Sequence, residues 1–317
     1  MTCNIIVTHR GNPPHLKYVL AQLKESNPNA NIILMGDKSN NKYKFITHAY
    51  LDDYFDGAKK FADDYIHMNG TNIDYELFCY QRWFAVYEYM QKHDLEDVFS
   101  LDSDVLVYDD LSQLHSLISK YSFAVSSKDL TETNPGWWIA GPPIGYFHRD
   151  ALKELINFFV NSYHDKKYLN LFDIKMQHHK QRGEPYGVCD MTQIFLFTRE
   201  NADKFFNLSK PFKLNNELTY IDETILDIAG CVAENGHKKI EFINGIAYGF
   251  NASDGQKLRF PLIHFQGYTP VNAKEWIPSF YHGRIYALNK IKDTFLSKKY
   301  WKIRKQIYGK KNEKISD

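Results

Sequence analysis

Two short apolar runs flank an amphipathic helix at the start of the chain, and this arrangement constrains the fold more than any other feature. Residues 4–8 and residues 31–35 are apolar, whereas residues 16–23 carry leucine and valine at helical spacing. A strand, a helix and a strand at this spacing predict a βαβ unit with a parallel sheet. Such sheets bind ligands at the carboxyl ends of their strands, where residues 8–10 and Asp37 fall.

The chain continues to alternate strands and helices, so we predict an α/β fold. We expect further strands at residues 45–50, 97–101, 105–108 and 122–125, and helices at residues 75–93, 152–159 and 189–197. The polar residues 175–187 are predicted to form a mobile loop. The last third is less regular, with a predicted helix at 222–235, strands near 240–250 and 260–264, and a helix at 284–296.

An acid pair stands between two of these strands. Asp102 and Asp104, separated by Ser103, follow the apolar residues 97–101 and precede the apolar residues 105–108. Two carboxylates at a strand exit can both turn toward one hard cation, which is usually shared with the phosphates of a substrate. Burying such a pair is costly unless something compensates its charge. The alternative is a strand-end turn, because Asp-Ser-Asp also suits a turn.

A histidine in the last third offers a third ligand. His264 ends the apolar run 260–264 and is followed by Phe-Gln-Gly267. Imidazole suits manganese better than magnesium, so two carboxylates and one imidazole, with positions left for diphosphate oxygens, predict an Mn²⁺ site. The alternative is that His264 is only structural.

Four polar residues are candidates for nucleotide contacts. Thr8, Arg10 and Asp37 lie at two strand ends, where a hydroxyl, a guanidinium and a carboxylate could bind a base, a phosphate and a ribose. Arg82, near the start of the helix before the acid pair, could bind a phosphate or form a surface salt bridge. The first strand is followed by neither Gly-x-Gly-x-x-Gly nor a Walker A loop, which argues against a dinucleotide site or a P-loop.

The acceptor side of a site is suggested by two further features. Trp137 and Trp138 are adjacent in the glycine- and proline-rich residues 134–143. Because two tryptophans are costly to expose, they either pack in the core or form an apolar platform for a sugar ring. Asp190 heads a predicted helix, where it could bind substrate or stabilise the helix start.

Charge and patterning limit the partners and the compartment. The net charge of +1 gives no global field that would recruit nucleic acid. The four cysteines are widely spread, there is no signal-peptide pattern and no stretch of 18 apolar residues, so we expect a cytoplasmic protein. Residues 298–317 are basic and aromatic, which suits either a peripheral contact with the inner face of an anionic membrane or a solvated tail.

Together these residues resemble a nucleotide-sugar glycosyltransferase of the GT-A fold. The Asp-x-Asp of Asp102 and Asp104 is similar to the metal motif of that family, and Arg82 resembles its upstream basic residue. His264-Phe-Gln-Gly267, followed by Trp276, resembles the glycogenin-like retaining branch. The branch's Lys-Pro-Trp directly after the glycine is missing here, and Trp-Ile-Ala-Gly-Pro-Pro replaces its Asn-x-Gly.

The resemblance implies a GT-A type, Rossmann-like mixed and mostly parallel sheet in one domain over residues 1–297. Residues 1–130 would form the nucleotide-binding half and residues 131–297 the acceptor-side half, with 298–317 as a tail. Mn²⁺, or Mg²⁺, would be held by Asp102, Asp104 and His264 against the diphosphate of a nucleotide-sugar, with a UDP-sugar as the expected donor.

The resemblance also implies that the loop around Gly267 contacts the diphosphate, with Ser103 beside it. Asp190 and Glu184 are the candidates for a base or nucleophile, and a glycan or lipid-linked sugar is the expected acceptor. Whether the reaction retains or inverts the anomeric configuration is left open. Two alternatives also remain open: a metal-dependent nucleotidyltransferase, and a non-catalytic carbohydrate-binding protein on the same fold.

Overall fold

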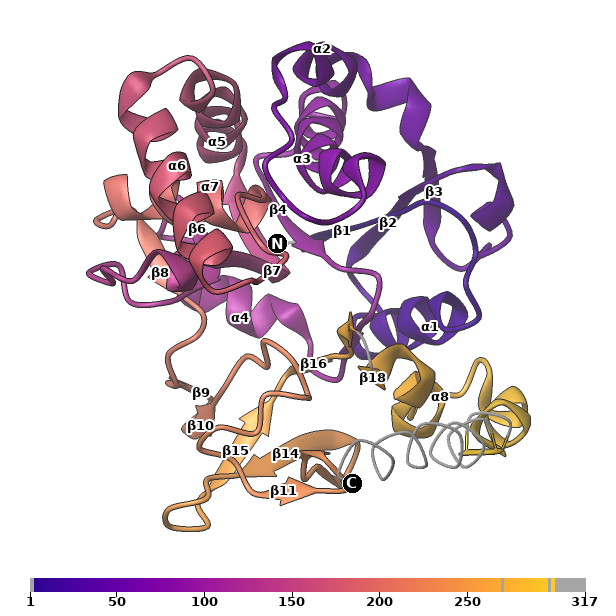
Figure 1. Cartoon of the computed structure of the whole chain (residues 1–317). Coiled ribbons are helices and arrows are strands. Elements are labelled where there is room, and N and C mark those ends of the chain that lie inside the picture. Colours follow the sequence, from indigo (N-terminus) through magenta and orange to yellow (C-terminus); the bar gives the residue numbers. More distant parts are fainter. Residues whose placement is uncertain (1–2, 269–270, 296–297, 300–317) are drawn as a thin grey trace.

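The computed structural model describes residues 3–268, 271–295 and 298–299. Its centre is a seven-stranded sheet with the order β3-β2-β1-β4-β7-β6-β8 (Figure 1). Strand β7 runs antiparallel to both of its neighbours, and the other pairings are parallel. The prediction of an α/β, mixed and mostly parallel sheet is therefore confirmed. Its strands are β1 (Asn4–His9), β2 (Asn31–Gly36), β3 (Thr47–Tyr50), β4 (Asp97–Leu101), β6 (Phe123–Ser127), β7 (Ala140–His148) and β8 (Phe205–Asn207).

Helices cover both faces of this sheet, because each strand alternates its apolar side chains between two cores. Ile6 and Ile33 pack into one core, and Ile5 and Val7 into the other. Figure 1 shows α1 (Leu16–Ser26) and α4 (Leu111–Ile118) below the sheet. The helices above it are α2 (Asp56–Asp64), α3 (Ile73–Lys92), α5 (Arg149–Ser162), α6 (Lys166–Gln181) and α7 (Asp190–Glu200).

The predicted helix at residues 75–93 is confirmed as α3. Asn72 caps its start by accepting hydrogen bonds from the backbone N–H groups of Asp74 and Tyr75. Trp83, with Met90 two turns further along, is buried against the sheet. This packing fixes the face of the helix that carries Arg82.

A smaller lobe forms from the last third of the chain, around a five-stranded sheet with the order β13-β14-β15-β10-β9 (Figure 1). Its strands are β9 (Phe212–Leu214), β10 (Glu217–Thr219), β13 (Glu241–Ile243), β14 (Ile246–Phe250) and β15 (Lys257–Phe260). The lobe joins the main body where β16 (Leu262–His264) pairs antiparallel with β5 (Val105–Val107). This pairing sets His264 opposite Val105, the residue that follows the acid pair.

Short elements complete the described chain. A hairpin is formed by β11 (Ala233–Glu234) with β12 (His237–Lys238), and β17 (Gly267–Tyr268) pairs antiparallel with β18 (Val271–Asn272). Residues 287–295 are helical, within the range predicted for the last helix. The remaining short helices are α8 (Ile277–Phe280) and the 3₁₀ turns η1 (Lys38–Asn40), η2 (Leu51–Tyr54), η3 (Pro135–Trp137) and η4 (Ala273–Trp276).

Two predicted segments are wrong. Residues 175–181 belong to helix α6, because Tyr168, Phe172, Lys175 and His179 recur at helical spacing and bury one face of it. The predicted helix at 222–235 is instead a series of turns that leads into the β11–β12 hairpin. Asn235-Gly236 form this hairpin's turn with positive φ angles of 51° and 81°, a strong hairpin signal that the helical interpretation overlooked.

No helix among the described residues is long and apolar enough to span a bilayer. The tail predicted to contact a membrane falls almost entirely on residues 300–317, which lie outside the described residues.

Candidate functional site

A cavity of about 700 Å³ opens at the carboxyl end of β4, beside the acid pair. It lies next to the boundary between β1 and β4, where the strand order of the main sheet reverses. Open α/β sheets bind their ligands at this position. Asp102, Asp104, His264, Asp190 and Trp137 are among the residues that line it.

Three side chains in this cavity form a candidate cation site. One ligand atom from each of Asp102, Asp104 and His264 lies within 4.8 Å of the other two. Backbone hydrogen bonds fix the loop, since Asp102 N donates to Pro143 O (3.1 Å) and Phe265 N donates to Asp104 O (2.9 Å). The three predicted ligands are thus brought together by the pairing of β4 with β7 and the pairing of β16 with β5.

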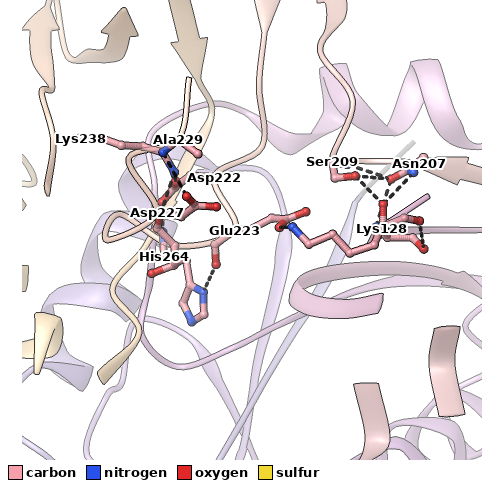
Figure 2. Close-up of polar contacts among 11 residues, drawn as sticks. Lys128, Asn207, Ser209, Asp222, Glu223, Asp227, Ala229, Lys238 and His264 are labelled. Atoms are coloured by element: carbon pink, nitrogen blue, oxygen red, sulfur yellow. Dashed lines mark hydrogen bonds and ion pairs between the residues drawn. The ribbon is translucent and has the colours of Figure 1, made fainter. Parts of the chain in front are cut away.

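The orientation of His264 is set by residues behind it. Its Nδ1 lies 2.6 Å from the carbonyl oxygen of Glu223, and its backbone N–H donates to Asp222 at 3.0 Å (Figure 2). The other ring nitrogen, Nε2, therefore faces Asp104, at 3.3 Å. A hydrogen bond at one ring nitrogen that leaves the other free is typical of metal-binding histidines.

Asp222 is in turn held by a buried ion pair. Its carboxylate lies 2.5 Å from Lys238 Nζ, and both side chains are almost completely buried (Figure 2). Lys238 also donates to the carbonyl oxygen of Thr224 at 2.7 Å. The sequence interpretation missed this pair because it placed residues 222–235 in a helix.

Two cations compensate the acids of the site. Arg82 donates to Asp102, and its second terminal nitrogen lies 3.3 Å from Asp190. Arg82 is therefore a bridge between two site carboxylates, not a surface salt bridge. Lys274 Nζ lies 3.0 Å from Asp104. The sequence interpretation missed Lys274 because it looked for a lysine directly after Gly267, whereas this one comes from η4.

The protonation of His264 predicts a pH dependence of metal binding. Burial opposes the imidazolium, but Asp104 outweighs burial and raises the pKa of His264 to about 9. A metal ion must displace this proton, so Mn²⁺ affinity should rise by about tenfold per pH unit below pH 9. Calorimetric Mn²⁺ titrations at pH 6, 7 and 8 measure the slope. An affinity that is flat over this range would contradict the assignment of His264 as a ligand.

The residues predicted to contact the nucleotide lie at the strand ends, as expected, but away from the cavity wall. Thr8, Arg10 and Asp37 are not among the residues that line it. Asp37 instead accepts from the backbone N–H groups of Gly11 (2.6 Å) and Ser39 (2.7 Å). The guanidinium carbon of Arg10 lies 4.2 Å from the ring centre of Phe78. Their nucleotide contacts therefore stay predictions.

Ser103 and Gly267 lie closer to the acid pair. Ser103 Oγ is 2.7 Å from His9 Nδ1, which ties the end of β1 to the acid-pair loop. Gly267 lines the cavity, and a Cβ at this position would collide with the side chain of Asn272. Only glycine therefore fits there without displacing its neighbour.

The two tryptophans separate. Trp138 is buried, with 5% of its surface exposed, and its Nε1 donates to Glu132 O at 3.0 Å. The prediction that Trp138 forms a sugar platform is therefore wrong, because its ring packs in the core. Trp137 is 53% exposed and lines the cavity. Its role as a platform stays a prediction.

The two candidate catalytic acids differ in their surroundings. Asp190 is buried at the start of α7, where its Oδ1 accepts from Met191 N at 2.8 Å. Burial raises the pKa of Asp190 against the opposing charge of Arg82. Glu184 lies 2.8 Å from His179 and 2.7 Å from Arg182, so both of its oxygens are engaged.

Glu76 is a buried acid that the sequence interpretation missed, since it resembles an ordinary first-turn residue of a helix. It lines the cavity, is 4% exposed and accepts from Thr71 Oγ1 at 2.9 Å. One ligand atom each of Glu76, Cys189 and Asp190 lies within 4.8 Å of the others. Burial and the neighbouring Asp190 raise the pKa of Glu76 to about 7.

We expect Glu76→Gln to stabilise the protein at pH 8. Because the pKa of Glu76 is about 7 in the folded state and about 4.3 when unfolded, the folded state binds the proton more tightly. Glu76 should therefore make stability fall as pH rises from about 4.5 to 7, by about 2–3 kcal/mol. Urea unfolding at pH 5 and pH 8 should show that E76Q removes most of this loss.

A matched control is the exposed Glu154, whose change to glutamine should alter stability by less than about 0.5 kcal/mol at either pH. If the free energy of unfolding of E76Q depends on pH in the same way as that of the native chain, Glu76 is not the source of the pH dependence.

The sequence matches no family model, and a search of curated proteins finds no relative. Among solved structures, mouse xyloside xylosyltransferase 1 in its apo form aligns with a TM-score of 0.47 and 7% identity, over 66% of this chain and 86% of that one. An active-site mutant of LgtC aligns with a TM-score of 0.47 and 13% identity, over 87% and 94% of the two chains. The apo structure of the bifunctional glycosyltransferase WbbM aligns with a TM-score of 0.46 and 11% identity, over 92% of this chain and 51% of that one. Identities this low leave the activity to be argued from the chain's own residues.

Proposed function

We propose that the chain is a metal-dependent glycosyltransferase that moves a sugar from a UDP-sugar to a glycan or lipid-linked acceptor. The observation that carries this proposal is the convergence of Asp102, Asp104 and His264 within 4.8 Å at one part of a 700 Å³ cavity. Two carboxylates and one imidazole nitrogen suit Mn²⁺, and Mg²⁺ less well.

The site fits a metal–diphosphate pair in its charge as well as its ligands. Nδ1 of His264 is engaged by Glu223 O, so Nε2 is the nitrogen available to a cation. The bound metal would neutralise charge that develops on the leaving diphosphate. Lys274 and Arg82, which contact Asp104 and Asp102, would supply positive charge to the diphosphate oxygens.

Asp190 is the better of the two candidate catalytic acids. It is joined to Asp102 through Arg82, so it lies next to the candidate cation site. Glu184 instead pairs with His179 and Arg182 near the end of α6, so no such bridge among the described residues joins it to Asp102. We therefore place Asp190 beside the transferred sugar, whether it orients the acceptor or stabilises positive charge on the sugar, and Trp137 as the apolar face for the acceptor.

The proposal is tested by measuring UDP release from a set of UDP-sugars, with Mn²⁺ and with EDTA. The expected result is slow hydrolysis of at least one UDP-sugar that stops with EDTA and falls by 100-fold or so in Asp190→Asn. Metal-dependent UDP binding without any release from the set would favour a non-catalytic carbohydrate-binding protein. Release of pyrophosphate from a nucleoside triphosphate would favour a nucleotidyltransferase.

The basic aromatic residues 298–317 are proposed to hold the protein at the inner face of an anionic membrane. Just before them, Leu288, Ile291 and Phe295 expose 89%, 75% and 67% of their surface. Apolar side chains next to lysines are the composition of an interfacial helix.

Deleting residues 298–317 should lower binding to phosphatidylserine-containing vesicles by about tenfold or more, since each lysine or arginine near such a surface contributes about 1 kcal/mol. Vesicle sedimentation measures this, with phosphatidylcholine vesicles as the control and UDP binding as the check on folding. Unchanged sedimentation of the truncated chain would rule the tail out as an anchor.

A further inference from the structure

Lys175 is a buried cation in the cavity wall that the proposed reaction does not use. It lies on α6 and exposes only 3% of its surface, yet it is one of the residues that line the cavity. Its Nζ donates to the carbonyl oxygen of Trp138 at 3.1 Å. Among the described residues, no carboxylate lies within ion-pair distance of this nitrogen.

None of the described acids that line the cavity forms an ion pair with Lys175, and Glu76 among them accepts from Thr71 Oγ1. Glu184 is engaged by His179 and Arg182, and Asp190 by Arg82. Burying an ammonium without a counter-ion is unfavourable, and burial lowers the pKa of Lys175 accordingly. An ammonium has three N–H donors, and the Trp138 carbonyl accepts one of them. Lys175 therefore keeps charge and donors that the described protein does not satisfy.

The position of Lys175 points to the acceptor. It lies against the loop of Trp137 and Trp138, while the candidate cation site is formed by the loop between β4 and β5 and by the end of β16. Trp137 beside it offers an exposed aromatic face to the same cavity. A ligand that stacks on this ring and presents an anionic group to Lys175 would satisfy both residues.

We propose that the acceptor is an anionic sugar, whose carboxylate or phosphate pairs with Lys175. This inference rests on the proposed glycosyltransferase function, because it assigns the acceptor of that same site. A uronic acid and a phosphorylated sugar present the same chemistry to a buried ammonium, and binding measurements distinguish them. Neutral sugars of the same shape would leave the ammonium unpaired and should bind more weakly.

The test is calorimetric titration of the full chain with methyl glucuronide, glucose 6-phosphate and methyl glucoside, each with and without UDP and Mn²⁺. At pH 7 one anionic sugar should bind at least tenfold tighter than methyl glucoside. The stronger of the two anions identifies the group as carboxylate or phosphate. In Lys175→Met the preference should fall below twofold, while Lys180→Met, at an exposed position of the same helix, should keep it.

Two further readouts keep the outcomes separate. The melting temperature of K175M should stay equal or rise, because methionine removes an uncompensated charge; a fall of several degrees would mean that Lys175 only anchors the Trp138 loop. UDP binding should be unchanged in K175M. If the native chain binds UDP with Mn²⁺ but prefers neither anionic sugar, the inference of an anionic acceptor is overturned and the proposed function stands. If the native chain does not bind UDP, the proposed function itself is overturned. Retention of the anion preference by K175M would also overturn the inference.

Discussion

Replacing Asp104 by asparagine is expected to weaken Mn²⁺-dependent UDP binding by about 100-fold or more, and turnover with it. Asp104 is 7% exposed, and its carboxylate lies 3.3 Å from His264 Nε2 and 3.0 Å from Lys274 Nζ. These two cations hold the pKa of Asp104 well below its usual range despite burial, so the carboxylate is ionised and ready for a metal. Asparagine keeps the shape but removes the charge that attracts the cation.

The matched control is Asp110→Asn, six positions further along the chain. Asp110 is an exposed N-cap that accepts from Ser112 N at 2.9 Å, and asparagine caps a helix equally well. This variant should bind UDP like the native chain. Calorimetry of both variants with Mn²⁺ measures the effect, and native-like, metal-dependent affinity in D104N would remove Asp104 from the cation site.

Replacing Asp222 by asparagine is expected to lower the free energy of unfolding by about 3–5 kcal/mol, because it leaves Lys238 buried without its partner. The two side chains are 1% and 2% exposed and 2.5 Å apart. The same carboxylate accepts the backbone N–H of His264, so the loosened histidine should also lower Mn²⁺ affinity by about tenfold. Urea unfolding and Mn²⁺ titration measure the two effects.

An exposed ion pair in the same lobe provides the comparison. Glu241 lies 2.6 Å from Lys239 with both side chains well exposed, so Glu241→Gln should change stability by less than about 1 kcal/mol. Adding Lys238→Met to Asp222→Asn should recover much of the lost stability, since it removes the unpaired charge. A loss below 1 kcal/mol in D222N would contradict the buried pairing.

The main sheet could be predicted from the sequence because its signals are local. Residues 4–8, 31–35 and 97–101 are apolar runs of strand length, and they form β1, β2 and β4. The amphipathic residues between them form α1. The acid pair was equally visible, since two carboxylates between apolar strands require compensation.

The rest of the site depends on contacts between distant residues. His264 reaches Asp104 only through the pairing of β16 with β5, and Lys274 reaches it from η4. Asp222 and Lys238 cannot be recognised as a pair from the sequence, because a charged pair in a turn-rich segment carries no periodic signal. The polar neighbours of Lys175 in the sequence predict a loop, whereas the structure places it on the buried face of α6, with its Nζ against the Trp138 carbonyl.

We propose that the acid pair and His264 hold a metal ion against the diphosphate of a nucleotide. The most direct test of this proposal is calorimetric titration of UDP into the native chain, once with Mn²⁺ and once with EDTA. We expect measurable UDP affinity with Mn²⁺ that is lost with EDTA. UDP binding that is equally strong in both conditions, or absent from both, would contradict the proposal.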